Sequence, residues 1–195
     1  MISKLKLIFS KNKKIIYFIL RVLIIYLAWK VLSFILGEES TPIQDRMWPW
    51  LSTGWESLND KIRIVILSVT QLWFNVVGLD SEIVNGYRLW VYDYAFVCVG
   101  NYCLAIQLWI FFVALIVSYS GKWYNKLWFS LIGIILINVI NVFRLIAVVY
   151  AAHYYPEYIQ FNHDYIFNVL VYIFTFFMWI WWVKRFSFER KEAIE

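Results

Sequence analysis

The stretch Leu127–Tyr150, LWFSLIGIILINVINVFRLIAVVY, decides the fold. Arg144 is its only charged residue, and the stretch is long enough to cross a bilayer core, which takes about 20 residues of helix. Three further runs are apolar over a similar length. They are Ile15–Leu36, Tyr102–Tyr119 and Tyr165–Val183. The sequence therefore predicts an all-α integral membrane protein with about four transmembrane helices.

The composition excludes a soluble protein. Of the 195 residues, 63% are hydrophobic and 16% are charged, whereas soluble domains average about 45–50% apolar and about 25% charged residues. A single water-soluble globule could not bury this much apolar surface, so a soluble enzyme, a disordered tail and a nucleic-acid partner are all excluded. We expect one membrane-embedded domain over residues 1–195, with the lipid bilayer as its surroundings.

The positions of the basic residues predict the topology. The net charge is +5, and the cations gather before the first run, between the second and third, and after the fourth. These clusters are Lys4, Lys6, Lys11, Lys13 and Lys14; Lys122 and Lys126; and Lys184, Arg185, Arg190 and Lys191. Because cytoplasmic loops retain Lys and Arg, we expect a multi-pass protein of the plasma or inner membrane with both termini cytoplasmic. The first run is too long for a signal-peptide core, so it is interpreted as an uncleaved anchor, within which Lys30 snorkels or finds a partner.

Residues 62–79 form a further apolar segment with a polar stripe. Ser68, Gln71, Asn75 and Gly78 recur at spacings of three and four, which puts them on one face of a helix. A fifth span here would move the C-terminal basic cluster outside, against the charge rule. We therefore expect an amphipathic helix that lies in the membrane interface.

A turn signal follows this segment. Asn85-Gly86 stands between apolar and aromatic residues within 81–92. Asn-Gly pairs favour tight hairpin turns because both residues tolerate positive φ. The sequence thus predicts a short extracytoplasmic β-hairpin just before the second span.

Residues able to do chemistry are few, and three of them fall at a similar depth. Cys103 and His163 lie at the outer ends of the second and fourth spans, and Arg144 lies late in the third. An arginine inside a span costs about 2.5–3.5 kcal/mol on insertion scales unless it has partners, and Asn138 and Asn141 precede it on the same helix. A structural arginine and an inert buried thiol are the alternatives.

This set of side chains suits nucleophilic catalysis. A fixed positive charge favours the thiolate form of a nearby cysteine, and a histidine can accept the thiol proton and later protonate a leaving amine. Arg144 could instead stabilise the oxyanion of a tetrahedral intermediate, and Asp164 could orient His163. His153, beside two tyrosines, is expected to be structural. Neither a metal-ligand spacing nor a phosphate-binding loop occurs in the sequence, so we expect no metal and no cofactor.

The order of these motifs resembles the exosortase and archaeosortase family. The resemblance covers about residues 65–183 and rests on four short motifs around the Asn-Gly hairpin. They are Leu72–Gly78, Asn101–Ile106, Asn141–Arg144 and Asn162–Asp164. The family cysteine is usually followed by Ser-Gly and a branched aliphatic residue, whereas Leu104, Ala105 and Ile106 follow it here.

The resemblance implies a membrane cysteine protease or transpeptidase, with Cys103 as nucleophile and with Arg144 and His163 as the other catalytic residues. Its partners would be membrane-anchored protein substrates carrying a C-terminal sorting signal, namely a short motif, a transmembrane helix and a basic cluster, cut at the extracytoplasmic face. Two alternatives from other classes stay open. One is a membrane thiol-disulfide oxidoreductase using Cys98 and Cys103, and the other is a non-catalytic membrane scaffold.

Overall fold

The computed structural model of the protein describes residues 13–36, 47–158 and 167–186. Within these residues, four helical segments are long and apolar enough to cross a membrane. They are α2 (Lys13–Leu36), the short 3₁₀ helix η2 (Asn101–Leu104) continued by α4 (Ile106–Ser118), α5 (Trp123–Tyr154) and α7 (Phe167–Phe186). The predicted number of candidate spans is confirmed for the described part of the chain.

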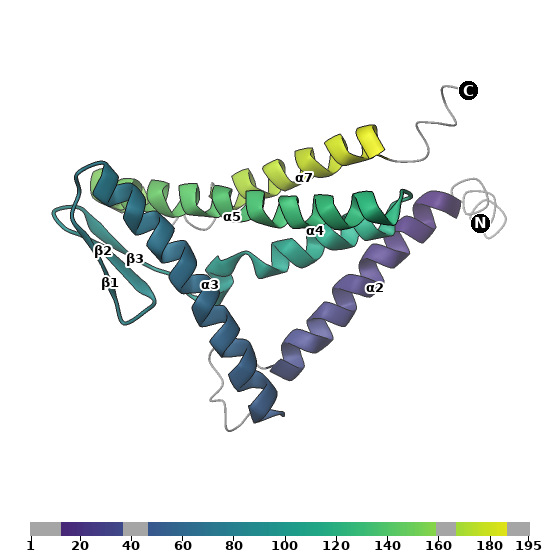
Figure 1. The fold of residues 1–195 in the computed structure, drawn as a ribbon, viewed down its shortest axis with the longest axis horizontal. Helices are drawn as coiled ribbons and strands as arrows, with labels where there is room; N and C mark the ends of the chain where they lie inside the picture. Colours follow the sequence, from purple (N-terminus) through teal and green to yellow (C-terminus); the bar gives the residue numbers. More distant parts are fainter. Residues whose placement is uncertain (1–12, 37–46, 159–166, 187–195) are drawn as a thin grey trace.

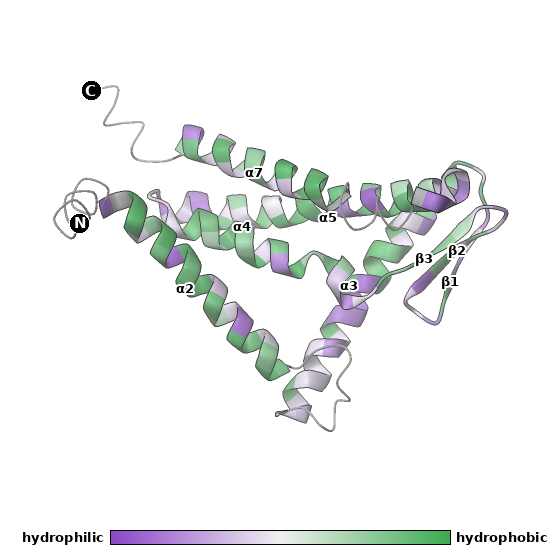
Figure 2. Ribbon diagram, turned by 180° about the vertical axis from the view of Figure 1, so that it is seen from behind, coloured by the Kyte–Doolittle hydropathy of each residue, from purple (hydrophilic) through white to green (hydrophobic). Residues whose placement is uncertain are grey.

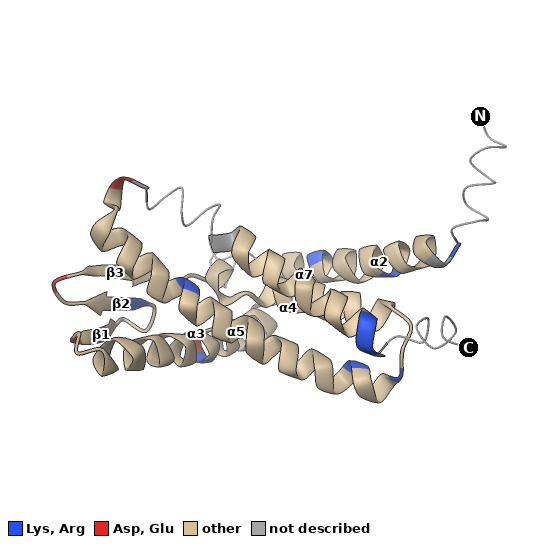
Figure 3. Cartoon of the chain, turned by 90° about the horizontal axis from the view of Figure 1, so that it is seen from above, with Lys and Arg blue, Asp and Glu red and all other residues tan. Residues whose placement is uncertain are grey.

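The helices and the sheet divide the molecule into two ends. Helices α4, α5 and α7 run side by side, and α2 approaches them obliquely (Figure 1). The beginning of α2, the α4–α5 connection and the end of α7 lie at one end, and the sheet lies at the other. Basic residues mark the first end, including Lys122 before α5 and Lys184 and Arg185 in the last turn of α7 (Figure 3).

Two spans have other bounds than the predicted ones. Helix α5 extends beyond the predicted Leu127–Tyr150 at both ends. In its first turn Lys126 donates a hydrogen bond from Nζ to the carbonyl of Val117, 2.9 Å away, and thereby satisfies one of the unpaired carbonyls at the end of α4. The second span is α-helical only over Ile106–Ser118, because its first residues form η2 instead.

Helix α3 (Pro49–Val76) is a single helix of 28 residues, so the predicted segment 62–79 was too short at its beginning. The proline in its first turn suits the start of a helix. Proline lacks a backbone N–H, and at this position an N–H would have no hydrogen-bond partner within the helix. Part of the predicted polar stripe binds the sheet: Gln71 Nε2 donates to the carbonyl of Ser81 at 2.7 Å, and Ser81 Oγ donates to Asn75 Oδ1 at 2.8 Å.

The predicted hairpin is part of a three-stranded antiparallel sheet in the order β1 (Ser81–Val84), β2 (Arg88–Val91) and β3 (Ala95–Cys98). Asn85 and Gly86 form the first turn with φ of 56° and 74°, as the Asn-Gly signal predicts. The third strand was missed. Its turn contains Asp93 at φ 60°, a conformation that aspartate tolerates better than most residues.

The core has two clusters, one at each end. Leu89, Val91 and Val97 on the inner face of the sheet pack with buried residues of α3 and α5, while Phe112 of α4 and Trp182 of α7 belong to the second cluster. Many large apolar side chains of the helices are exposed, and Figure 2 shows that hydrophobic residues predominate along the helices. A surface of this kind fits a hydrocarbon environment, in which apolar side chains need no further cover.

Close packing of α4 on α5 leads to the first testable prediction. A Cβ built at Gly133 of α5 would clash with the ring of Phe112, which is fully buried. Gly133→Ala must displace that ring, and overpacking of this kind costs about 1–3 kcal/mol. The thermal stability of the purified protein in detergent should therefore fall.

Gly54→Ala is the matched control. Gly54 lies inside α3, where an added Cβ meets nothing within 4 Å. Alanine is favoured over glycine by about 1 kcal/mol in an exposed helix, so this variant should be as stable as the wild type or more so. Equal melting temperatures for the two variants would contradict the packing described here.

Candidate active site

Cys103 lies in a tight turn that joins the sheet to α4. The turn is η2, in which the backbone N–H of Cys103 donates to the carbonyl of Gly100 at 2.9 Å. The side chain is partly buried against the apolar cluster at the sheet end of the molecule. The chain then passes through Ala105 at φ 58°, ψ 15°, and starts α4.

Helix α5 holds this turn through one buried side chain. Asn141, which is 1% exposed, donates from Nδ2 to the carbonyl of Cys103 at 2.7 Å. Its Oδ1 accepts a longer hydrogen bond from Arg144 Nη1, at 3.4 Å. The amide of Asn141 therefore connects the guanidinium of Arg144 with the main chain of Cys103.

A second polar network holds η2 from the side of α3. Asn101 accepts a hydrogen bond from Arg63 Nη2 at 2.6 Å and donates from Nδ2 to Glu56 Oε2 at 3.1 Å. Arg63 also pairs with Asp60 at 2.5 Å. Hydrogen bonds between charged groups and neutral amides are stronger than neutral ones, so the residue two positions before Cys103 is firmly placed.

Two cavities flank the turn. The larger, which we term the polar cavity, has a volume of about 400 Å³ and is lined by Lys30 and Ser33 of α2 and by Glu56 and Asn59 of α3. The smaller, of about 80 Å³, is lined by Asn141 and Arg144 of α5 and by two residues of α7. Four residues line both cavities: Asn101, Tyr102, Ile106 and Gln107. The neighbours of Cys103, rather than its thiol, thus separate the two spaces.

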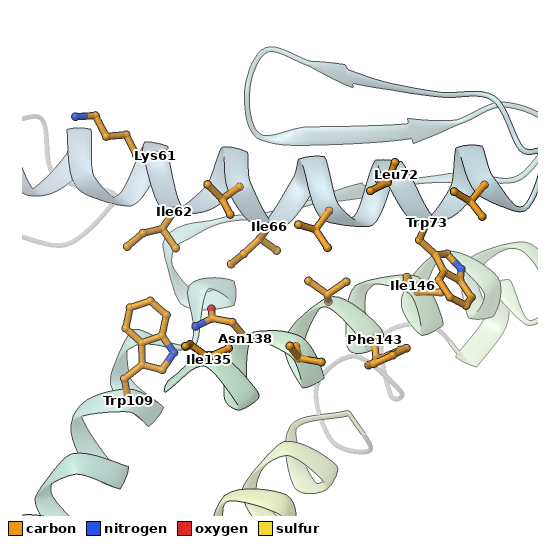
Figure 4. A pocket seen from close by; sticks show the side chains of 15 residues that line it. Lys61, Ile62, Ile66, Leu72, Trp73, Trp109, Ile135, Asn138, Phe143 and Ile146 are labelled. Atoms are coloured by element: carbon orange, nitrogen blue, oxygen red, sulfur yellow. The ribbon is translucent and has the colours of Figure 1, made fainter. Parts of the chain in front are cut away.

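An apolar groove of about 710 Å³ lies between α3 and α5 (Figure 4). Its lining residues Ile62, Ile66 and Trp109 also belong to, or pack against, the apolar cluster that Cys103 contacts. Asn138 adds the one amide in the lining. The groove and the side chain of Cys103 therefore border the same apolar cluster.

The structure brings three of the predicted site residues together and separates one. Cys103, Asn141 and Arg144 are connected as described. Asn138, one helical turn earlier, donates to the carbonyl of Ile134 in its own helix at 2.8 Å and lines the groove. His163 and Asp164 lie outside the described residues.

The remaining cysteine and histidine belong to the sheet end. Cys98 and Cys103 are both free thiols. Cys98 is exposed and faces Arg88 across the β2–β3 pair, and its hydrogen bond and charge raise the pKa of the Arg88 guanidinium. His153 stacks on Tyr94 with ring centroids 4.2 Å apart, the kind of contact expected for a structural histidine.

Comparison with known proteins identifies no relative: no family model, curated protein or solved structure matches the chain. Among the described residues, no group of three or more His, Cys, Asp or Glu side chains is placed to hold a metal ion. What the arrangement offers chemically is a thiol packed against the apolar cluster at the sheet end and, connected to the main chain of the same residue, an amide and a guanidinium that line the smaller cavity.

Three residues of the site were not predicted, namely Glu56, Asn59 and Arg63. They recur on α3 at spacings of three and four, so they share one helix face. That periodicity was available in the sequence, but the predicted helix began at residue 62 and left most of the face outside it. The pattern becomes informative only when α3 is extended back to Pro49.

The left-handed conformation of Ala105 yields the second prediction. A residue with a Cβ in the αL region destabilises the folded state by roughly 1–2 kcal/mol. Replacement by glycine removes this strain, but it also favours the unfolded state by about 0.4–1 kcal/mol because the unfolded chain gains conformational entropy. Ala105→Gly should therefore stabilise the protein by roughly 0.5–1 kcal/mol, measured as a higher melting temperature.

Ala114→Gly provides the comparison, since Ala114 is buried within the regular part of α4. Here glycine has no conformational advantage, and the substitution should destabilise the protein by about 1 kcal/mol. A loss of stability in Ala105→Gly as large as that in Ala114→Gly would show that the turn is not strained.

Proposed function

We propose that the protein is a membrane-embedded cysteine protease or transpeptidase of the exosortase and archaeosortase type. The observation that carries this proposal is the hydrogen-bonded connection from Arg144 through Asn141 to the main chain of Cys103. A merely structural arginine has no need to be coupled to the one turn that bears a partly buried thiol. The motif order in the sequence supports the same conclusion.

In the proposed mechanism, the sulfur of Cys103 attacks the carbonyl carbon of a substrate peptide bond. The thiol proton passes to His163, whose role comes from the family resemblance. The C–N bond then breaks, and the amine leaves with the proton from His163. The acyl group stays on Cys103 as a thioester until water or another amine attacks it, which frees the thiol.

Arg144 would act on the charge that develops in this reaction. A fixed guanidinium can favour the thiolate or bind the oxyanion of the tetrahedral intermediate. Its planar donors are oriented by the bond to Asn141 Oδ1, and Asn141 is itself fixed by the carbonyl of Cys103. Preorganisation of this kind is what makes a donor effective in a site from which water is excluded.

The basic end of the helix bundle would face the cytoplasm, according to the charge rule, and the sheet end would face outward in the plasma or inner membrane. The turn with Cys103 follows β3 directly, so the proposed reaction takes place on the outer side. Substrates would be exported proteins held in the bilayer by a C-terminal apolar helix and a basic cluster. Helix α3, which is amphipathic and not among the candidate spans, would lie along the outer interface.

The third prediction concerns the nucleophile. Cys103→Ala removes the attacking sulfur, so in the native host exported proteins that end in an apolar helix and a basic cluster should accumulate at full length. Quantitative mass spectrometry of C-terminal peptides in membrane fractions measures this directly. The variant protein should be present in the membrane in wild-type amounts.

Cys98→Ser separates this reading from a thiol-disulfide oxidoreductase. The protease needs only Cys103, so Cys98→Ser should process substrates like the wild type, whereas a redox enzyme that uses both cysteines would lose its activity in either variant. Unchanged C-terminal peptides in Cys103→Ala would refute the proposed function altogether.

The fourth prediction concerns Arg144. Lysine keeps the positive charge but loses the planar fork of donors, and loss of one oxyanion donor typically slows acyl transfer by about 100-fold or more. Arg144→Lys should therefore slow processing by about this factor, measured by pulse-chase labelling of a substrate identified in the preceding experiment. Arg88→Lys, on the outer face of the sheet, is the matched control and should process at the wild-type rate.

A further inference from the structure

We propose that the apolar groove between α3 and α5 holds one acyl chain of an anionic phospholipid, whose phosphate group pairs with Lys61. This inference does not depend on the proposed protease activity. The groove has a volume of about 710 Å³, and Lys61 is the only charged residue among those that line it. The walls, the dimensions and the charge of the groove each support the assignment.

Both walls of the groove are apolar and exposed. On α3 they include Val65 and Val69, which are 62% and 49% exposed, and on α5 they include Ile135 and Phe143, which are 60% and 52% exposed. Figure 4 shows side chains of α3 and α5 on the two sides of this space. A concave apolar surface of this size marks a binding site for an apolar group.

The dimensions of the groove fit a hydrocarbon chain rather than a helix. Its α3 wall runs from Lys61 to Val76, which is about 22 Å at a rise of 1.5 Å per residue. The volume of about 710 Å³ divided by this length gives a mean cross-section of about 32 Å², whereas a helix about 10 Å in diameter with its side chains needs about 80 Å². An acyl chain spans half of the bilayer core, about 15 Å, so one chain fits lengthwise.

Lys61 supplies the charge at one end of the groove. Its stem belongs to the lining, and its ammonium group points away from the apolar side chains (Figure 4), as in long cationic side chains that keep the charge in polar surroundings. Lys61 forms no ion pair among the described residues, whereas Arg63 pairs with Asp60. The ammonium group therefore favours a lipid with net negative charge, because a zwitterionic headgroup carries a competing cation of its own.

The position of α3 explains how a lipid reaches the groove. Figure 4 shows two strands of the sheet and the groove on opposite sides of α3. With the sheet facing outward, as the charge rule predicts, the groove lies on the side of α3 that faces the bilayer. A lipid of the outer leaflet then places its acyl chain in the groove and its headgroup beside Lys61.

The experiment uses the full-length protein, purified in detergent and depleted of lipid. Native mass spectrometry during titration with phosphatidylglycerol should detect one tightly bound molecule, and phosphatidylcholine with the same acyl chains should bind about fivefold more weakly. Lys61→Gln should weaken the binding of phosphatidylglycerol about fivefold and remove this preference. Lys122→Gln is the matched control, because it removes the same charge at the start of α5, outside the groove, and should bind like the wild type.

Two tryptophan variants test the groove itself. Val69→Trp places a large ring in the groove and should abolish the tight binding of phosphatidylglycerol. Ile64→Trp lies on the same helix, where Ile64 is 48% exposed against 49% for Val69, but outside the lining, and should bind like the wild type. Because both positions are exposed, neither substitution forces the core to repack, and the melting temperature of the lipid-depleted protein should be the same in both.

Several results would overturn the lipid site. They are wild-type protein that binds no phosphatidylglycerol tightly, Val69→Trp that binds it as well as Ile64→Trp does, and equal affinities in Lys61→Gln and Lys122→Gln. A dimer that Val69→Trp dissociates while lipid binding is unchanged would assign the groove to a second copy of the chain. A transmembrane peptide whose binding shows the same sensitivity, again with unchanged lipid binding, would assign it to a helix, and either result refutes the proposal.

Discussion

The structure of the site depends on the hydrogen bond from Asn141 to the carbonyl of Cys103. This bond is partly buried, and it joins the middle of α5 to the short 3₁₀ turn η2. Without it, the carbonyl of Cys103 would lose this hydrogen-bond partner, and an acceptor left unpaired away from water costs about 1–3 kcal/mol. The same amide presents its oxygen to Arg144. One side chain thus connects the guanidinium of Arg144 to the main chain of the turn that carries Cys103.

The bilayer explains which parts of this fold could be predicted from the sequence. Candidate spans are recognisable because an apolar run of about 20 residues is long enough to cross a bilayer and is rare in other structures. The helices α2, α5 and α7 lie close to their predicted ranges. The hairpin was predicted because Asn85 and Gly86 have a conformational preference that belongs to the residues themselves. The third strand, by contrast, is only four residues long. It is held by pairing with β2 and by packing on α5, and its own residues do not predict either contact.

The site was predictable only in part, for a related reason. Depth along a span can be counted, so residue positions put Arg144 and Cys103 at a similar depth, and the structure connects Arg144 to the main chain of Cys103 through Asn141. The direction of a side chain around the helix was less certain: Asn138 and Asn141 were assigned to one strip, yet only Asn141 reaches the turn, while Asn138 bonds within its own helix. The polar cavity combines three separate segments, and no single stretch of sequence contains its pattern.

Helix α3 borders both the polar cavity and the apolar groove. Its first half directs Glu56 and Asn59 to the polar cavity, and its later residues Ile66 and Trp73 line the groove against α5. Its last turns bind the sheet through Gln71. A helix with these three partners needs polar residues where it meets the polar cavity and the sheet. It needs apolar residues where it lines the groove. The amphipathic character of α3 is therefore a consequence of its position between the sheet, the polar cavity and the apolar groove.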